Sequence, residues 1–282
     1  MSWTAIARKD FQDAARSRAL WGLTALFVLF MAGMAWVFTL FRDSAGAGAP
    51  PELESVGLLF FLVSPVTLLI PITGLVVAHK AIAGEIESGS VKFLLSLPHT
   101  RRDAVVGKVA GRSAVMSAAV LVGLVVAAVV VLATYDSFDA TAYVGFSVLA
   151  VLLAALYTAV GVGLSAFTKD GGRATILAIG FYVVFDLVWG VVPMGVNYLL
   201  NNSFVPSGAP PEWYLLLNRV PPSSAFSSAV FGFLPGNSPA VAQYFPQDVP
   251  FYLSKWAAVA TMLLWFVVVP ALGYWRFQAA DL

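Results

Sequence analysis

Residues 113–135 read SAVMSAAVLVGLVVAAVVVLATY and contain no charged side chain. A helix needs about 20 predominantly apolar residues to cross ~30 Å of hydrocarbon, so this segment alone is long enough to span a membrane. Five further segments of similar length carry almost no charge. We expect transmembrane helices at 20–41, 55–78, 113–135, 140–168, 174–200 and 256–275. The sequence therefore predicts an all-α integral membrane protein, with residues 1–282 forming a single transmembrane domain.

The overall composition supports a membrane protein. Hydrophobic residues make up 60% of the chain and charged residues only 11%, whereas soluble domains carry roughly 25% charged residues. Absence of cysteine excludes disulfides and thiolate chemistry. The net charge of +1 indicates no nucleic-acid partner. No cluster of residues suggests a metal site: we interpret His79 and His99 as surface residues, and Met31 and Met34 as packing residues.

The distribution of basic residues predicts the orientation. If the N-terminus is inside, the inner segments hold 13 of the 16 Lys and Arg residues. An excess of Lys and Arg marks cytoplasmic loops, and an even number of spans returns the chain to its starting side. We therefore expect a multi-pass protein of the cell membrane with both termini in the cytoplasm.

Two segments outside the spans have an interfacial character. Residues 1–19 place Trp3, Ala7 and Phe11 at helical spacing, with basic residues on the other side. This pattern predicts a helix on the membrane surface that contacts lipid headgroups, although a plain polar lead-in to the first span would look similar. The external loop 201–255 contains an apolar stretch at 225–234 that is too short to span and suggests a re-entrant or interfacial helix.

The segment 79–112 reads HKAIAGEIESGSVKFLLSLPHTRRDAVVGKVAGR and lies on the expected cytoplasmic side. Residues 81–87 continue the second span as a helix that Gly89 ends. A short apolar element at 91–97 stops at Pro98. Thr100 and Asp103 form a capping-box signal for a new helix. The apolar residues among these charges indicate either a surface for another protein or an element lying along the membrane, and the residues alone leave both readings open.

This segment resembles the one that follows the second span in ABC-2-type ABC transporter permeases, and the layout of the whole chain is similar to that family. The stretches ValPheAspLeu at 184–187 and TrpTyrLeuLeuLeuAsn at 213–218 look most like the permease of the nitrous-oxide-reductase maturation, or copper-processing, system. Ser90 stands where the family usually has Thr. The positions that carry the cytoplasmic resemblance are Glu85, Glu87, Gly89, Leu94, Leu95, Pro98, Arg101, Gly107 and Lys108.

The resemblance implies a division of labour between subunits. The segment 79–112 would act as a coupling element seated on a separate ABC ATPase, present in two copies, and the nine positions above would transmit its movement. ATP and Mg would bind the ATPase, and this chain would bind no cofactor and would not be an enzyme. A second permease copy would complete a homodimer or a related heterodimer. Most members of the family look like exporters, so the resemblance implies that this chain takes part in export.

The sequence independently excludes one mode of ATP binding. A phosphate-binding loop requires GxxxxGK followed by Ser or Thr. Gly107 and Lys108 are followed by Val109, and the position of the first glycine is Arg102. The chain therefore lacks the loop that would hold ATP phosphates in this way.

Asp186 is the one ionisable residue deep within a predicted span. A central Asp costs roughly 2.5–3.5 kcal/mol on insertion, so we expect it to line a substrate path or to be hydrogen-bonded between helices. The sequence also leaves open two alternatives to a transporting ABC permease, of which only the first depends on Asp186 and the second would share the same layout. One is an ion- or proton-coupled secondary transporter that uses Asp186, and the other is a non-transporting membrane scaffold driven by an ATPase.

Overall fold

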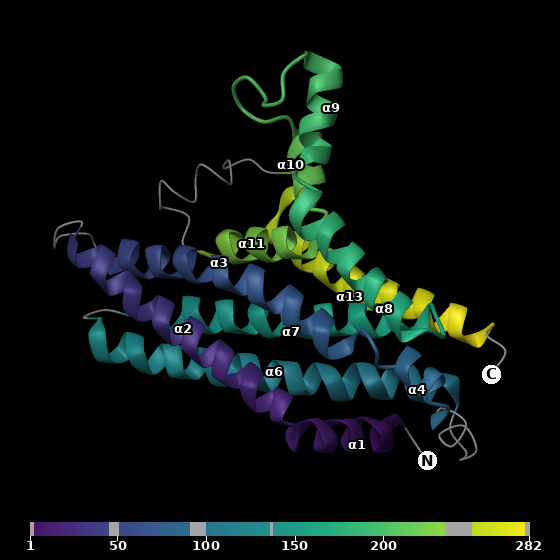
Figure 1. Cartoon of the computed structure of the whole chain (residues 1–282). Coiled ribbons are helices and arrows are strands. Elements are labelled where there is room, and N and C mark those ends of the chain that lie inside the picture. The colour runs from purple at the N-terminus through teal and green to yellow at the C-terminus, as the bar shows by residue number, and fades with distance from the viewer. Residues whose placement is uncertain (1–2, 45–50, 91–99, 136–137, 235–249, 280–282) are drawn as a thin grey trace.

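A computed structural model describes residues 3–44, 51–90, 100–135, 138–234 and 250–279 (Figure 1). All regular secondary structure in these residues is helical. Within them, six helices are long and apolar enough to cross a membrane. The predicted all-α fold with six spans is therefore confirmed. The six spans are Leu20–Leu40, Gly57–Glu87, Arg101–Thr134, Ala140–Ala166, Gly171–Val188 and Lys255–Gln278.

Helix α7 (Ala140–Ala166) forms the centre of the bundle. It packs against α3 (Pro51–Ala78), α6 (Arg101–Thr134) and α13 (Lys255–Gln278), while α2 (Arg18–Ser44) crosses the outer face of α6 (Figure 1). The central part of α7 is rich in small residues, which let neighbouring helix backbones approach closely. The core around it includes Phe27, Leu62, Met116, Leu153 and Tyr157, all fully or almost fully buried.

The tightest helix contact joins α7 and α13 through two glycines. A Cβ atom added to Gly163 would lie 2.8 Å from the carbonyl oxygen of Val269, and one added to Gly273 would collide with the carbonyl of Gly163. Apolar burial gives little driving force between helices in lipid, so close backbone packing of this kind contributes much of the association. A larger residue at position 163 or 273 would push the two helices apart, so this close contact needs glycine at both positions.

The two ends of the bundle differ in character. One end, here called the basic end, holds α1 (Trp3–Ala15), α4 (Ala83–Glu87), the start of α6, the start of α8 (Gly171–Tyr182) and the end of α13 (Figure 1). The opposite end holds the ends of α2 and α6 and the starts of α3 and α7 (Figure 1). Helices α10 (Glu212–Asn218) and α11 (Pro222–Phe233) and the turn η2 (Phe251–Leu253) lie along the side of the bundle, away from the basic end (Figure 1). The start of α1 and the end of α13 thus lie at the same end of the bundle, as an even number of spans requires.

Helix α6 begins at the predicted capping box. The Thr100 hydroxyl accepts from the Asp103 backbone N–H at 3.1 Å, and the Asp103 carboxylate accepts from the Thr100 N–H at 3.1 Å. At 1.5 Å per residue, its 34 residues extend about 50 Å, which is well beyond a bilayer core of ~30 Å. Helix α1 packs along this extension, so it lies on protein and is not supported by lipid headgroups alone. Its most buried side chain is Ile6, whereas Trp3 and Phe11 are exposed.

The fifth span differs from the continuous helix predicted over 174–200. Helix α8 passes into a π-helical stretch, η1 (Val183–Val188), and the span ends there. A separate helix, α9 (Val191–Asn201), then projects from the bundle (Figure 1). Pro193 has no N–H to donate to the carbonyl of Trp189, so the α-helical ladder cannot run through this point. Hydropathy alone does not detect this break, because both sides of it are equally apolar.

Residues 225–233 of the apolar stretch lie in α11, which packs along α7 and against α13. Two side chains attach the neighbouring loop to α13 and η2. The Trp265 indole N–H donates to the Val220 carbonyl at 2.8 Å, and the Arg219 guanidinium donates to the Leu253 carbonyl. Burial lowers the pKa of Arg219 from its usual value. The segment between the fifth and sixth spans is therefore fastened to the bundle where it is described.

We predict that Gly273→Ala destabilises the fold. The added methyl group must push α13 away from the Gly163 carbonyl, which costs about 1–3 kcal/mol for overpacking, and the thermal unfolding midpoint of the detergent-purified protein should fall by several degrees. Gly145→Ala is the matched control, because a Cβ at Gly145 meets no atom within 4 Å. A Gly273→Ala protein as stable as the Gly145→Ala protein would contradict the close contact.

Candidate functional site

The basic end brings together most of the positions that the sequence singles out. Helix α4 lies at its centre and follows α3 after a turn at residues 79–82. The buried Ser165 hydroxyl of α7 accepts from the backbone N–H groups of Ile82 and Ala83, each at 3.0 Å. Two N–H groups that the turn frees from the helical ladder are thus satisfied by α7. Gly89 has φ +74°, a left-handed conformation typical of glycine after a helix, so it ends α4 as predicted.

Lys108 is the most buried charged residue of this end, with 4% of its surface exposed. Its ammonium lies 2.6 Å from the Glu85 carboxylate of α4 and 3.4 Å from the Asp10 carboxylate of α1. Arg112, one turn further along α6, lies 3.4 Å from the other Asp10 oxygen and donates to the Val77 carbonyl of α3. A buried ammonium requires such partners. One lysine therefore joins three helices.

Two glycines of α6 explain why α1 packs so closely against it. A Cβ added to Gly107 would lie 2.7 Å from Ile6 Cβ, and one added to Gly111 would lie 2.8 Å from the Ala7 carbonyl oxygen. Larger side chains at either position would hold α1 away from α6. Because Asp10 is carried on α1, the same approach brings its carboxylate within reach of Lys108 and Arg112.

Glu87 and Arg101 connect α4 and α6 to the remaining spans. The Glu87 carboxylate accepts from the Gly171 N–H at 3.1 Å, at the first residue of α8. The Arg101 guanidinium donates to the carbonyls of Phe277 and Gln278 at 2.6 and 2.9 Å, at the end of α13, and lies over the Phe277 ring with its Cζ atom 5.4 Å from the ring centroid. The last carbonyls of a helix have no partner within the helix, so Arg101 satisfies two of them.

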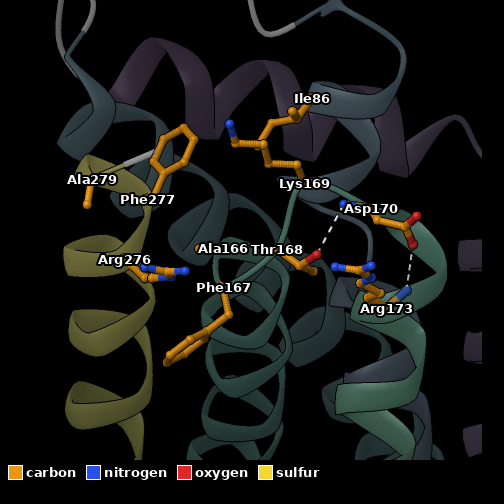
Figure 2. A pocket seen from close by; sticks show the side chains of 10 residues that line it. All are labelled: Ile86, Ala166, Phe167, Thr168, Lys169, Asp170, Arg173, Arg276, Phe277 and Ala279. Atoms are coloured by element: carbon orange, nitrogen blue, oxygen red, sulfur yellow. Dashed lines mark hydrogen bonds between the residues drawn. The ribbon is translucent and has the colours of Figure 1, made fainter. Parts of the chain in front are cut away.

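The sequence analysis did not identify the turn between α7 and α8, at residues 167–170, as part of a site. Asp170 caps α8, because its carboxylate accepts from the Arg173 N–H at 2.7 Å. The signal was present, since Asp followed by two glycines and a helical pattern is typical of a helix start. Together with the end of α13, this turn borders a pocket of about 350 Å³ (Figure 2). Its basic side chains are Lys169, Arg173 and Arg276.

Not every predicted site residue can be placed. Leu94, Leu95 and Pro98, together with His99, lie in 91–99, outside the described residues. Glu85, Glu87, Gly89, Arg101, Gly107 and Lys108 are brought together at the basic end. Among the described residues, no group of three or more His, Asp or Glu is placed to hold a metal ion. His79 caps the carbonyl of Val76 at 2.8 Å, and Met31 is buried in the core.

Asp186 lies far from this end, in η1. The hydroxyls of Tyr157 (α7) and Ser223 (α11) lie 2.6 and 2.5 Å from its Oδ1 atom and 2.7 Å from each other. Its Oδ2 atom is buried and has no hydrogen-bond partner. Asp186 therefore connects the π-helical stretch to two other helices. π-Helical turns recur at functional sites, and this one places the carboxylate against fully buried Tyr157.

Comparison with known proteins agrees with this architecture. Residues 4–282 match the family model described as ABC-2 family transporter protein. The chain belongs to the ABC-2 transporter family. It is 30% identical over 286 residues to the probable ABC transporter permease protein NosY of Pseudomonas aeruginosa, covering 98% of this chain and 97% of that protein. It is also 30% identical over 220 residues to the NosY protein of Stutzerimonas stutzeri, covering 76% of each. The resemblance to ABC-2 permeases is thereby confirmed.

The Lys108 contacts of the permease lead to a stability prediction. Lys108→Met leaves the Glu85 and Asp10 carboxylates without their shared cation, and removal of one partner from a buried ion pair costs about 3 kcal/mol. We expect a lower thermal midpoint and faster proteolysis within α1. Lys9→Met, at an exposed position of α1, is the control and should behave as wild type. Equal effects of the two substitutions would show that α1 is held without Lys108.

Asp186 leads to a second prediction. Asp186→Leu removes the acceptor shared by Tyr157 and Ser223, and an unsatisfied buried hydroxyl costs about 1–3 kcal/mol. Asp186→Asn retains a carbonyl oxygen at Oδ1, so it should lose less than half as much stability. Thermal midpoints of the three proteins in one detergent provide the measurement. If Asn and Leu are equally destabilising, the hydrogen bonds at Oδ1 contribute little and the charge itself is what the fold requires.

Proposed function

We propose that this chain, the permease subunit of an ABC transporter, couples ATP hydrolysis on separate ATPase subunits to export of a substrate across the cell membrane. ATP and Mg would bind the ATPase, and this chain would bind neither. Two permease copies, identical or related, would pair with two ATPase copies. The chemistry described at the basic end is that of an interface: ion pairs and helix caps hold elements together, and the spans contribute hydrogen bonds and close packing.

The orientation in this proposal places the basic end in the cytoplasm. The described basic residues of this end include Lys80, Arg101, Lys108, Lys169 and Arg276. The positive-inside rule assigns such an end to the cytoplasmic side. Both termini would then be cytoplasmic, and the ATPase would meet the end that carries α4.

The observation that carries the proposal is the number of spans bonded to one short helix. Helix α4 has five residues, yet Glu85 pairs with Lys108 of α6, Glu87 pairs with Gly171 of α8, and the turn before it is bonded to Ser165 of α7. A force on the segment that follows Gly89 would therefore reach the third, fourth and fifth spans together. This is the arrangement that a coupling element requires.

The test reconstitutes the permease with its ATPase in liposomes and measures the Kd of the complex and the stimulation of ATP hydrolysis. A Leu94→Ala/Leu95→Ala protein should bind about 30-fold more weakly, because each truncation removes several methyl and methylene groups from a buried contact. The control is Leu199→Ala/Leu200→Ala, at two exposed leucines of α9, away from the basic end (Figure 1). It should bind the ATPase as wild type does.

A further arm of the experiment separates docking from transmission. Glu87→Ala removes the bond to Gly171 but leaves residues 91–99 intact, so the ATPase should bind with unchanged Kd while its stimulation falls severalfold. If the Leu94→Ala/Leu95→Ala protein binds as tightly as its control, the ATPase docks elsewhere. If Glu87→Ala retains full stimulation, the path through α4 and α8 is wrong, and the measured Kd decides the docking of the ATPase separately.

A further inference from the structure

The pocket at the basic end is surrounded by cations from two different helices and a turn. Lys169 comes from the turn after α7, Arg173 from the first turn of α8, and Arg276 from the last turn of α13. In Figure 2, Arg173 and Arg276 stand on opposite sides of the hollow, with Lys169 above them. The pocket has a volume of about 350 Å³. Three positive charges around one hollow attract an anion.

The acidic residue of the pocket does not cancel this charge. Asp170 is the one acidic residue among those that line it. Its carboxylate is turned to the Arg173 backbone N–H as the cap of α8 (Figure 2). The Glu87 carboxylate accepts from the Gly171 N–H and is not among the residues that line the pocket. With three basic side chains and one acidic, the lining carries a formal charge of +2.

The pocket adjoins a surface that faces lipid. Phe167, which lines it, is 38% exposed, and Trp275, next to Arg276, is 70% exposed. Further along the two bordering helices, Ile176 of α8 and Leu272 of α13 are also exposed. Trp at the end of a span is typical of the interface between hydrocarbon and headgroups. The two helices meet only deeper, where the rings of Phe181 and Trp265 lie 5.3 Å apart.

We propose that this pocket binds the phosphate group of an anionic phospholipid. The guanidinium groups of Arg173 and Arg276 would contact the phosphate oxygens, for which the planar donors of arginine are well suited. The acyl chains would extend along the exposed apolar residues of α8 and α13. Basic pockets between transmembrane helices on the cytoplasmic side bind anionic headgroups in this way. The inference stands on the pocket and its surroundings and does not depend on the ATPase.

A lipid fits these surroundings better than an acidic segment of a partner protein. An acidic segment that approaches from water would contact the basic side chains, but it would leave the apolar residues that continue from the pocket toward the bilayer without a binding partner. A phospholipid uses both, because its charged and apolar parts are joined in the same order as these two surfaces. An acidic protein segment is therefore an outcome of the test and not the proposal.

The experiment uses the permease in bilayer nanodiscs of phosphatidylethanolamine with about 20% phosphatidylglycerol, which is the anionic probe. After extraction in mild detergent, mass spectrometry counts the phosphatidylglycerol that stays bound to each chain. Arg173→Gln/Arg276→Gln should weaken retention by about 25-fold, or about fivefold for each arginine. Arg173→Lys/Arg276→Lys keeps both charges but loses the planar donors, so its retention should lie between those of the wild type and the Gln variant.

The matched control is Arg8→Gln/Arg16→Gln, which removes one exposed charge from α1 and one from the turn that follows it. It should retain phosphatidylglycerol as wild type does, and equal loss in the two double variants would overturn the site. Soluble glycerol phosphate forms another arm. If it raises the thermal midpoint of the wild type as much as the lipid does, the pocket takes a free phosphate and the lipid source is wrong. Loss of ATPase binding with unchanged lipid retention would assign the pocket to the partner and also overturn the proposal.

Discussion

A single buried charge sets the arrangement of the basic end. Lys108 is 4% exposed, and an ammonium in such a position is costly unless carboxylates surround it. Glu85 and Asp10 meet that requirement, but only if α4 follows α3 to the start of α6 and α1 packs along α6. The positions of both short helices are therefore consequences of one lysine. Gly107 and Gly111 make the same geometry sterically possible, since they leave room for α1.

The membrane spans and the basic end are stabilised by different kinds of interaction. Within the spans, association depends on small residues and direct backbone contact, as between Gly163 and Gly273, because lipid provides little hydrophobic driving force between helices. At the basic end, water is near and ion pairs and helix caps replace that packing. Arg101 on the last carbonyls of α13 and Glu87 at the start of α8 belong to this second kind. Asp186 differs from both kinds, because it brings a carboxylate and two hydroxyl groups together within a span.

Local signals in the sequence predicted what is local in the structure. The apolar runs predicted six spans, and Thr100 with Asp103 predicted the start of α6. The burial of Lys108 was not predictable, because its partner Asp10 lies 98 residues away and a Gly-Lys pair before an apolar run looks like an exposed boundary. The break near Gly190 was missed because Pro193 stands among apolar residues on both sides. The start of α6 well before its span was predicted, but nothing in the pattern of α1 revealed that α1 would pack against this extension.

The spans also divide by stiffness. Helix α6 runs for 34 residues and α7 for 27 without a proline, whereas α3 contains Pro65 and Pro71, α13 contains Pro270, and the fifth span passes through a π-helical stretch. Prolines and π-bulges are where long helices bend. Helices α6 and α7 therefore lack such bending points, whereas α3, α13 and the fifth span each contain one or more. We therefore expect a displacement at Lys108 to move α6 as one straight element, while α3, α13 and the fifth span bend.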